Sequence, residues 1–363
     1  MPGLIADSLP DAWGEKLLRQ ELPEVRTIMG KLAAVGSRGP GAITFAPALG
    51  SSGATGTAMD LRELADAANR LRAATVPLTT DRINQQLARG GSSLGGAFPK
   101  IAAHLPLDAA TVLEKREILI GGKPPTGHVP CILKFEREND EADGAVEFAF
   151  TQMAKAAGLR VPQTCLVQDG RRRHFATARF DRIPGPRGAW HRRHVHTLAG
   201  LLHKRASDGA IDYEEFIRLA RTLGGAPEAV ECFRRAVFNL LSTNRDDHGR
   251  NHAFLYDENE RRWTLAPAYD LNPNVANVLI GLSWLGSTRI PATREELLRL
   301  AEVGGVPAKQ ARAIYEQVEE AVLGGWPKHA AEAKVPTPMI SYWEREMLNQ
   351  TTALRHSMRN PAS

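Results

Sequence analysis

Beyond about residue 195, apolar residues recur every three or four positions over long segments. This spacing places them on one face of an α-helix and so predicts amphipathic helices. The segments are 213–223, 228–241, 295–303, 308–323 and 342–358. The second half of the chain is therefore expected to be helical, with one short β-like run at 253–256.

Before residue 195 the pattern is mixed. Helical spacing occurs at 11–21, from residue 60 onward and at 145–157, where Gly158 is placed to end the helix. Short β-like runs at 117–120 and 129–135, and a strand pair at 161–167 and 173–180, follow a glycine-rich turn at 90–96. The pattern predicts an α+β fold with two unequal lobes. The smaller is mixed, with a β-sheet (1–195), and the larger is all-helical (196–363).

The composition is that of an ordinary globular protein, with 363 residues, 43% hydrophobic and 24% charged. No run of 18 apolar residues is found, so neither a transmembrane helix nor a membrane partner is expected. The start of the chain lacks the pattern of a signal peptide. The three cysteines are widely spaced in apolar contexts, as expected of reduced core thiols. These features predict a cytoplasmic protein.

The net charge of +5 tolerates an anionic partner but does not require one. Basic residues are dense at 171–173 and 191–194. Neither segment carries the interleaved aromatic residues of a single-strand binding surface. Both are expected to be solvated loops.

The segment 244–254 carries the densest group of candidate catalytic residues. Asp246 and Asn251 are five positions apart, which is the spacing of the kinase catalytic loop D-x-x-x-x-N. In that loop the aspartate accepts the proton of the attacking hydroxyl, and the asparagine oxygen holds Mg²⁺. Asp270 ends an apolar stretch 19 residues later and would be the second Mg²⁺ ligand.

Other interpretations of these residues are open. Asp246 and Asp247 could cap a turn, and Asp270 could begin an Asx-turn before Asn272. His248 and His252 could form the H-x-x-x-H pair of a metal-dependent hydrolase if they lay on a helix, although Gly249 argues against a helix there.

Lys134 is a lone charge in an otherwise apolar strand. A lysine at such a place can reach ATP phosphates, with Glu147 of the following helix as its ion-pair partner. An edge-strand charge and an exposed helix glutamate are the alternatives.

Several of these segments resemble motifs of the HipA family of bacterial serine/threonine kinases, the toxins of type II toxin–antitoxin pairs. Residues 246–251 resemble the family's D-x-H-x-x-N motif, and Tyr269-Asp270 its Y-D element. Residues 93–100 are similar to its S-x-x-G-A-x-x-K loop, 132–135 to the strand with its ATP-binding lysine, and 179–182 to its R-F-D-R signature. Residues 4–14 and the turns at 35–36 and 39–42 also resemble family segments, so the likeness spans almost the whole chain.

The resemblance implies a two-lobed, protein-kinase-like fold with ATP and Mg²⁺ as cofactors. Asp246 would be the catalytic base, and Asn251 and Asp270 the metal ligands. The residues expected to contact ATP are Lys134, Glu147, Ser93, Gly95, Gly96 and His248. Ser93, or less readily Ser92, would be the autophosphorylated serine whose modification stops the kinase by occupying the space of the ATP phosphates.

The chain starts almost at the L-P-D motif of the family, which resembles the short HipT-type kinases. In those, a small HipS-like protein supplies the missing N-terminal segment. The second serine of the short kinases is replaced by Gly91, which puts dual-site regulation in doubt. The implied partners are a HipB-like DNA-binding antitoxin, DNA only through that antitoxin, and an aminoacyl-tRNA synthetase as substrate.

Two other functions are compatible with the sequence. One is a catalytically weak, nucleotide-binding corepressor in a DNA-bound complex, supported only by the basic segments near Arg171 and Arg192. The other is a small-molecule or lipid kinase, because the same base and metal geometry serves any hydroxyl acceptor.

Overall fold

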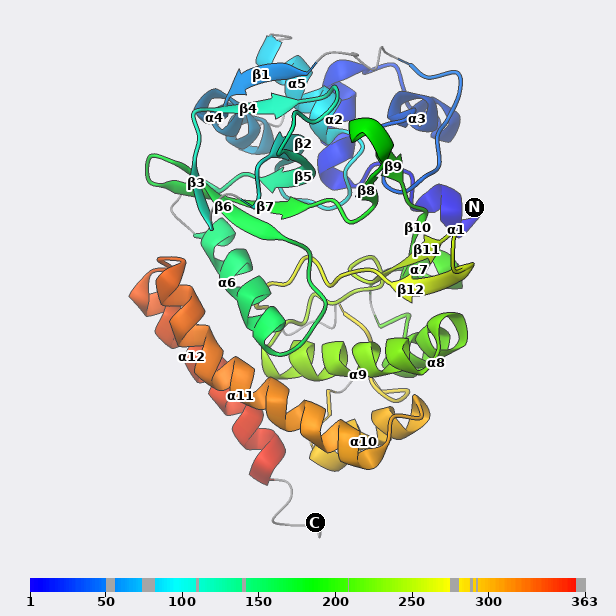
Figure 1. Ribbon diagram of the computed structural model, residues 1–363, viewed down its shortest axis with the longest axis vertical. Helices are drawn as coiled ribbons and strands as arrows, with labels where there is room; N and C mark the ends of the chain where they lie inside the picture. Colours follow the sequence, from blue (N-terminus) through cyan, green and yellow to red (C-terminus); the bar gives the residue numbers. More distant parts are fainter. Residues whose placement is uncertain are drawn as a thin grey trace. The chain divides into compact units, whose positions relative to one another are not determined.

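The computed structural model describes residues 1–49, 56–73, 82–108, 111–138, 142–207, 209–274, 281–287, 290–291 and 293–356. The chain divides into two compact units. The first comprises Gly3–Phe148 and Pro162–His194, and the second Ala149–Val161 and Val195–Ser363. Helix α6 (Asp143–Ala156) begins in the first unit and ends in the second (Figure 1).

Among the described residues, a seven-stranded sheet forms the centre of the first unit. Its strand order is β1-β4-β2-β5-β7-β6-β3, and all neighbours are antiparallel except β3 and β6. In chain order the strands are β1 (Thr57–Asp60), β2 (Lys100–Leu105), β3 (Val112–Glu114), β4 (Glu117–Ile120), β5 (Val129–Lys134), β6 (Thr164–Asp169) and β7 (Arg172–Ala178).

Helices bury their apolar faces in one cluster with this sheet. Leu17, Leu64 and Leu87 come from three different helices and share the cluster with Ile101 and other apolar residues of the strands. The helices are α2 (Ala12–Glu21), α4 (Leu61–Ala73) and α5 (Arg82–Gly91). The unit also contains α1 (Gly3–Ala6), α3 (Ile28–Val35), a 3₁₀ turn (Pro186–Gly188), and the paired strands β8 (Arg182–Pro184) and β9 (Trp190–Arg192).

The prediction of a single glycine-rich turn over 90–96 is wrong at its start. Gly90 and Gly91 are the last residues of α5 and are buried. A Cβ on Gly90 would lie 2.3 Å from Ile101 Cγ1, and one on Gly91 would lie 2.6 Å from Leu17 Cδ1. These two glycines therefore let α5 approach β2 and α2 closely, and the turn begins only at Ser92.

The R-F-D-R segment forms a buried ionic cluster that holds an earlier loop. Asp181 accepts hydrogen bonds from Arg179 (2.8 Å), Arg182 (2.6 Å) and the backbone N–H of Gly41 (2.8 Å). Burial alone would raise the pKa of Asp181, but the two guanidinium groups outweigh it and lower the pKa to about 2. Arg192 donates to four backbone carbonyls of the same loop, those of Ser37, Gly39, Gly41 and Ile43.

The two basic segments are therefore not the solvated loops that the sequence predicted. Arg192 lies on β9, and its guanidinium N–H groups donate to the loop carbonyls just described. Arg172 lies on β7 and pairs with both Asp66 and Asp169, each at 2.6 Å. Arg171, by contrast, is exposed.

Helix α9 (Ala226–Leu241) packs against most of the other elements of the second unit (Figure 1). Its neighbours are α8 (Tyr213–Gly224), α10 (Arg294–Val303), α11 (Ala308–Glu332), α12 (Thr337–His356) and β12 (Arg262–Leu265). Strands β10 (Val195–Thr197), β11 (Ala253–Asp257) and β12 form an antiparallel sheet, and α7 (Leu198–Leu202) follows β10. Asp212 closes a capping box with Glu215, which explains why α8 begins at Tyr213.

The α+β class is confirmed, and the expected helices of the second half are present. The sheet β10-β11-β12 is an addition to the helical pattern, of which the sequence indicated only the strand at 253–256. The three cysteines are buried free thiols, as predicted. Within the described residues, every helix is too short or too polar to span a membrane.

Candidate active site

The segment 244–252 connects α9 to β11 as a compact loop. The backbone N–H of Asn251 donates to the carbonyl of His248 (2.8 Å), which closes a turn. Gly249 lies at the tightest point, because a Cβ there would be 2.6 Å from Ile211 Cδ1. The side-chain amide of Asn251 donates to the backbone carbonyl of Asp246 (2.7 Å). The loop thus brings Asn251 back against Asp246.

The Asp246 carboxyl group is accessible in the second unit. Its side chain is 45% exposed, and its Oδ1 lies 3.9 Å from His248 Nε2. Partial burial raises the pKa of Asp246, and the nearby carboxylate of Asp270 adds to the rise, while His248 opposes it.

Asp270 follows β12 at the end of an extended segment. The hydroxyl of Tyr269 donates to the backbone carbonyl of Arg250 (2.6 Å), which ties this segment to the loop. Asp270 has a φ of +57°, in the left-handed region that non-glycine residues rarely adopt. The segment that carries Asp270 is therefore bonded to the loop that carries Asp246 and Asn251.

The donor atoms at this place suit Mg²⁺. Asn251 uses its amide N–H₂ on the Asp246 carbonyl, which leaves its Oδ1 as the acceptor end, and Asp270 adds carboxylate oxygens. Magnesium prefers a few hard oxygen ligands together with phosphate oxygens. Within the described residues, no group of three histidine, cysteine, aspartate or glutamate side chains is placed to hold a metal ion.

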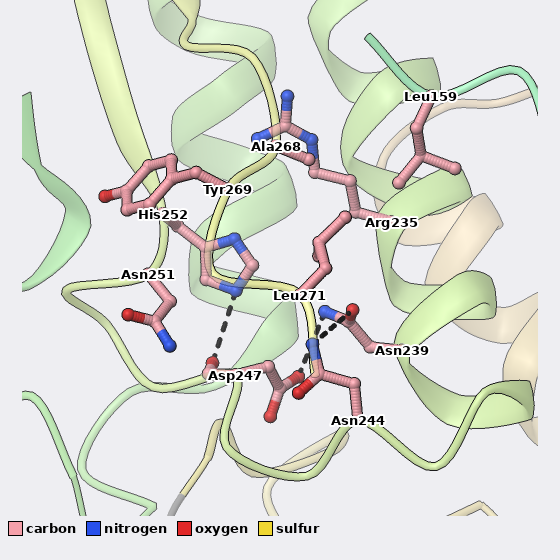
Figure 2. A pocket seen from close by; sticks show the side chains of 10 residues that line it. All are labelled: Leu159, Arg235, Asn239, Asn244, Asp247, Asn251, His252, Ala268, Tyr269 and Leu271. Atoms are coloured by element: carbon pink, nitrogen blue, oxygen red, sulfur yellow. Dashed lines mark hydrogen bonds between the residues drawn. The ribbon is translucent and has the colours of Figure 1, made fainter. Parts of the chain in front are cut away.

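Asp247 has a different role from its neighbour. Its carboxylate is buried and accepts a hydrogen bond from the Tyr213 hydroxyl. It also accepts one from the Asn239 amide at 3.4 Å (Figure 2). Burial raises the pKa of Asp247 to about 6, although the bond from Tyr213 opposes the rise. The sequence left the direction of this side chain open, and the structure turns it into the interior of the unit.

His252 is part of the same interior. Its Nε2 donates to the backbone carbonyl of Asp247 (3.2 Å), and burial lowers its pKa to about 3, so the ring is neutral near pH 7. Residues 246–252 do not form a helix, so His248 and His252 do not share a helix face. The H-x-x-x-H interpretation is therefore wrong.

A small cavity lies where the loop, the Asp270 segment and α9 meet (Figure 2). Its volume is about 10 Å³, room for one water molecule and far too little for a nucleotide. Leu159 and residues of those three segments line the cavity. The residues of the three segments are Arg235, Asn239, Asn244, Asp247, Asn251, His252, Ala268, Tyr269 and Leu271. Tyr213, Asn239 and Asn244 were not expected from the sequence to belong to this region. A polar residue within an apolar helix was the available signal, since Asn239 interrupts the buried face of α9.

In the first unit, Lys134 and Glu147 form the expected ion pair. Lys134 Nζ lies 2.5 Å from Glu147 Oε1, with the side chains only 14% and 7% exposed. The ammonium group also lies 5.8 Å from the centre of the Phe175 ring. A pair this well buried holds the lysine in a fixed direction, which an exposed edge-strand charge would not do.

The turn that follows α5 is packed against the start of α2. The Ser93 hydroxyl donates to the backbone carbonyl of Arg38 (3.0 Å), and Ser92 and Ser93 are only 2% and 5% exposed. The N–H of Gly96 donates to Asp11 (2.8 Å), and Lys100 Nζ donates to the Gly95 carbonyl (2.7 Å).

Gly96 has a φ of +93°, and a Cβ there would lie 2.4 Å from Lys100 Nζ, so the turn requires glycine at this position. The N–H of Gly96 is already bonded to Asp11 in this conformation.

Comparison with known proteins agrees with these motifs. A model of the HipA-like C-terminal domain matches residues 92–326, which is more than half of the chain. The chain belongs to the HipA-like family. The matched region of this family member includes Ser93, Lys134, Glu147 and the loop from Asn244 to His252.

Individual relatives are more distant. The chain is 30% identical over 132 residues to the "Putative kinase Y4mE" of Sinorhizobium fredii, and 31% identical over 139 residues to a protein of Haemophilus influenzae described in the same way. Each alignment covers 34% of this chain and 31% or 39% of the relative, so the chain spans about a third of the length of these curated relatives.

A solved structure shares the fold of this HipA-like chain. It is HipA of Shewanella oneidensis in a complex with HipB and operator DNA, with a TM-score of 0.72 and 18% identity. The match covers 98% of this chain and 85% of that one. It supports the fold assigned above, and at this identity it does not transfer an activity.

Proposed function

We propose that this protein is an ATP- and Mg²⁺-dependent serine/threonine protein kinase that acts as the toxin of a type II toxin–antitoxin system. The observation that supports the proposal is that Asn251 bonds back to Asp246, and that Tyr269, next to Asp270, bonds the same loop at Arg250. Asp246, Asn251 and Asp270 are the set of groups that phosphoryl transfer to a hydroxyl requires.

Each residue has a distinct task in this proposal. Asp246 would accept a hydrogen bond from the substrate hydroxyl and then its proton, and its 45% exposed side chain is accessible to such a hydroxyl. Asn251 and Asp270 would hold Mg²⁺, which when bound neutralises charge on the transferring phosphate. His248 lies next to Asp246 and would orient a phosphate group there.

The residues of the first unit would bind the nucleotide phosphates. Lys134 supplies a positive charge whose direction Glu147 fixes. Ser93, Gly95 and Gly96 would supply backbone N–H groups when the turn takes a conformation other than the one described, in which Gly96 N–H bonds Asp11.

Autophosphorylation on Ser93, or less readily on Ser92, would regulate the enzyme. The bond from Ser93 to the Arg38 carbonyl must break before the hydroxyl can accept a phosphate, and its burial means that the turn must leave its present packing. A phosphate with a charge near −2 would not fit back into that buried position. Phosphorylation of Ser93 would therefore keep the turn from returning to its present packing.

The partners proposed here follow from the family and from the complex in which the Shewanella protein was solved, which contains HipB and operator DNA. A HipB-like antitoxin would bind this chain and connect it to DNA, and a HipS-like protein would be a further partner. The target would be an aminoacyl-tRNA synthetase, whose phosphorylation would inhibit translation in the cytoplasm.

Incubation of the purified protein with γ-labelled ATP and Mg²⁺ tests the proposal. We expect label on Ser93 and on a protein of a cell extract, and a loss of transfer by at least about a hundredfold in Asp246→Asn, as for removal of a general base. Glu258→Gln is the matched control, because Glu258 is an exposed carboxylate on the turn after β11 and should leave transfer unchanged.

Three outcomes would contradict the proposal. ATP binding without any transfer would indicate a nucleotide-binding corepressor. A phosphorylated metabolite with no phosphoprotein would indicate a small-molecule kinase. Equal transfer by wild type and Asp246→Asn would remove the catalytic role of the loop.

A further inference from the structure

Helix α9 carries a stripe of buried polar residues. Glu228, Glu231, Arg235 and Asn239 are spaced by three, four and four positions, which places them on one side of the helix. Their exposed fractions are 3%, 7%, 1% and 3%. Burying four polar side chains is unfavourable unless each has partners, so the partners indicate what the stripe does.

The first part of the stripe holds the segment that leads to Asp270. Glu228 accepts a hydrogen bond from the backbone N–H of Leu265 (2.9 Å). Arg235 donates to the backbone carbonyl of Ala266, and its Nε donates to Glu231 (3.0 Å), which fixes the guanidinium group. Leu265 and Ala266, which one peptide link joins, are thus both bound to the same helix face, five and four residues before Asp270.

Arg160, in the connection between α6 and β6, bonds both the polar stripe of α9 and the segment that leads to Asp270. Its backbone N–H donates to Glu231 (3.2 Å), its side chain pairs with Glu228, and its carbonyl accepts from the N–H of Ala268 (2.7 Å). The segment 265–268 is therefore held along its length, either by α9 itself or through Arg160.

The last residue of the stripe holds the catalytic loop. Asn239 Oδ1 accepts from the Asn244 amide (3.1 Å), and its Nδ2 donates to the Tyr213 hydroxyl (3.0 Å) and, more weakly, to Asp247 (3.4 Å). Asp247 is the residue directly after Asp246. The loop position thus depends on a neutral amide of α9 and on the carboxylate that it helps to orient (Figure 2).

One backbone feature shows that the Asp270 segment needs such support. Asp270 has a left-handed backbone conformation, with a φ of +57°, which a non-glycine residue keeps only where surrounding contacts hold it. Without a rigid support, Asp270 would relax toward an ordinary backbone conformation and its side chain would move.

We infer that Glu228, Arg235 and Asn239 are positioning residues, and that α9 sets the distance between the base and the metal-binding carboxylate through this stripe. They act through the backbone groups and the side chains to which they bond, and they do not contact the substrate themselves. The inference rests on the proposed function for its effect on rate, but the placement of the two segments can be measured without any catalysis.

Hydrogen-exchange mass spectrometry of the full chain provides that measurement. In Arg235→Lys, the loss of the planar guanidinium should speed exchange in peptides covering 265–271 by about tenfold, because the bonds to Ala266 and Glu231 cannot both be kept. In Asn239→Leu, exchange should rise by a similar factor in 244–252. Arg234→Met is the matched control, since Arg234 is its neighbour on α9 but bonds Ala157 and Gln317 instead.

The kinetic readout separates positioning from simple loss of folding. Arg235→Lys should lower kcat by about a hundredfold while KM for ATP changes by less than about threefold, since a misplaced group affects the transition state more than nucleotide binding. Arg235→Met should show faster exchange in 265–271 and a lower kcat than Arg235→Lys. Circular dichroism and the exchange of α11 peptides would report a general loss of folding.

The inference is overturned if exchange in both segments is unchanged, or if it rises equally throughout the second unit. A wild-type protein without phosphate transfer would contradict the proposed function alone. In that case the exchange pattern in 244–252 and 265–271 would still decide whether α9 positions the two segments.

Discussion

Asp246 and Asp247 are neighbours in the chain with the same functional group and opposite surroundings. The Asp246 side chain is 45% exposed, while Asp247 is enclosed by the Tyr213 hydroxyl and the Asn239 amide. The exposed carboxylate of Asp246 is accessible to a substrate hydroxyl, as the proposed function requires. The buried carboxylate of Asp247 instead bonds side chains in the interior beneath the loop. The different roles follow from the direction in which each side chain leaves the backbone.

The raised pKa of Asp247 predicts a pH-dependent stability. Its pKa is about 6 in the folded protein and about 3.9 in an unfolded chain, so the folded state binds the proton more tightly. The stabilising contribution is complete below about pH 3.9 and is lost as the pH rises through about 6. A difference of about two pKa units corresponds to about 3 kcal/mol. Urea unfolding of wild type and Asp247→Asn between pH 4 and pH 7.5 should show wild type losing about this much relative to the variant.

The comparison has an internal control. Glu258→Gln removes an exposed carboxylate of the same unit and should follow the wild-type curve across this range, because water solvates that group in both states. Parallel curves for wild type and Asp247→Asn would mean that Asp247 does not titrate differently on folding.

At the scale of single elements, helix α5 shows how a local signal can mislead. Its last two residues are glycines, and they are helical because β2 and α2 leave no room for side chains. Glycine is a poor helix former, so the sequence favours a turn there. The packing of three elements outweighs that preference of roughly 1 kcal/mol per glycine.

Substitution of two helical glycines should have opposite effects on stability. Gly90→Ala places a Cβ 2.3 Å from Ile101 Cγ1 and should destabilise the first unit by about 1–3 kcal/mol through overpacking. Gly324→Ala in α11 meets no atom within 4 Å and should stabilise the second unit by about 0.5–1 kcal/mol through helix propensity. Urea unfolding curves of each variant measure both changes.

The exposed Gln85→Ala in α5 is the control for Gly90→Ala and should change stability by less than about 0.5 kcal/mol. If Gly90→Ala were as stable as wild type, α5 and β2 would not be packed as closely as the structure has them.

At the scale of the whole molecule, each unit carries its own fixed group of candidate site residues. In the first unit, a buried ion pair holds Lys134. In the second, α9 and the loop hold Asp246, Asn251 and Asp270. The contacts described above for each group join residues of one and the same unit.

Under the proposed function, binding of Mg²⁺ and a non-hydrolysable ATP analogue should depend on Lys134 and on Asp270. A ligand at a hundred times its Kd stabilises the folded protein by about 2.7 kcal/mol, which raises Tm by several degrees. We expect Lys134→Met and Asp270→Asn each to reduce this rise to less than half. The measurement is a thermal melt with and without the analogue, and Arg234→Met should keep the full rise. An undiminished rise in either variant would contradict the nucleotide-binding role of that residue.

The sequence alone located many of the helices and strands and the loop that carries the candidate site residues. Apolar spacing located α8, α9 and α10 and strands such as β4 and β5, because hydrophobic periodicity and helix caps are local properties of the chain. The spacing of Asp246 and Asn251 indicated the loop for the same reason, since both lie within one short segment.

Only the tertiary structure decided what surrounds these residues. Asp247 is turned toward Tyr213, which is 34 positions away, and Asp181 holds the backbone N–H of Gly41, which is 140 positions away. Glu228 and Arg235 of α9 bind Leu265 and Ala266, which are 37 and 31 positions away. Residues 92–96 likewise pack on α2 and residues 265–268 on α9. Periodicity reveals which face of a helix is buried, but it does not reveal which backbone groups the polar residues of that face will meet.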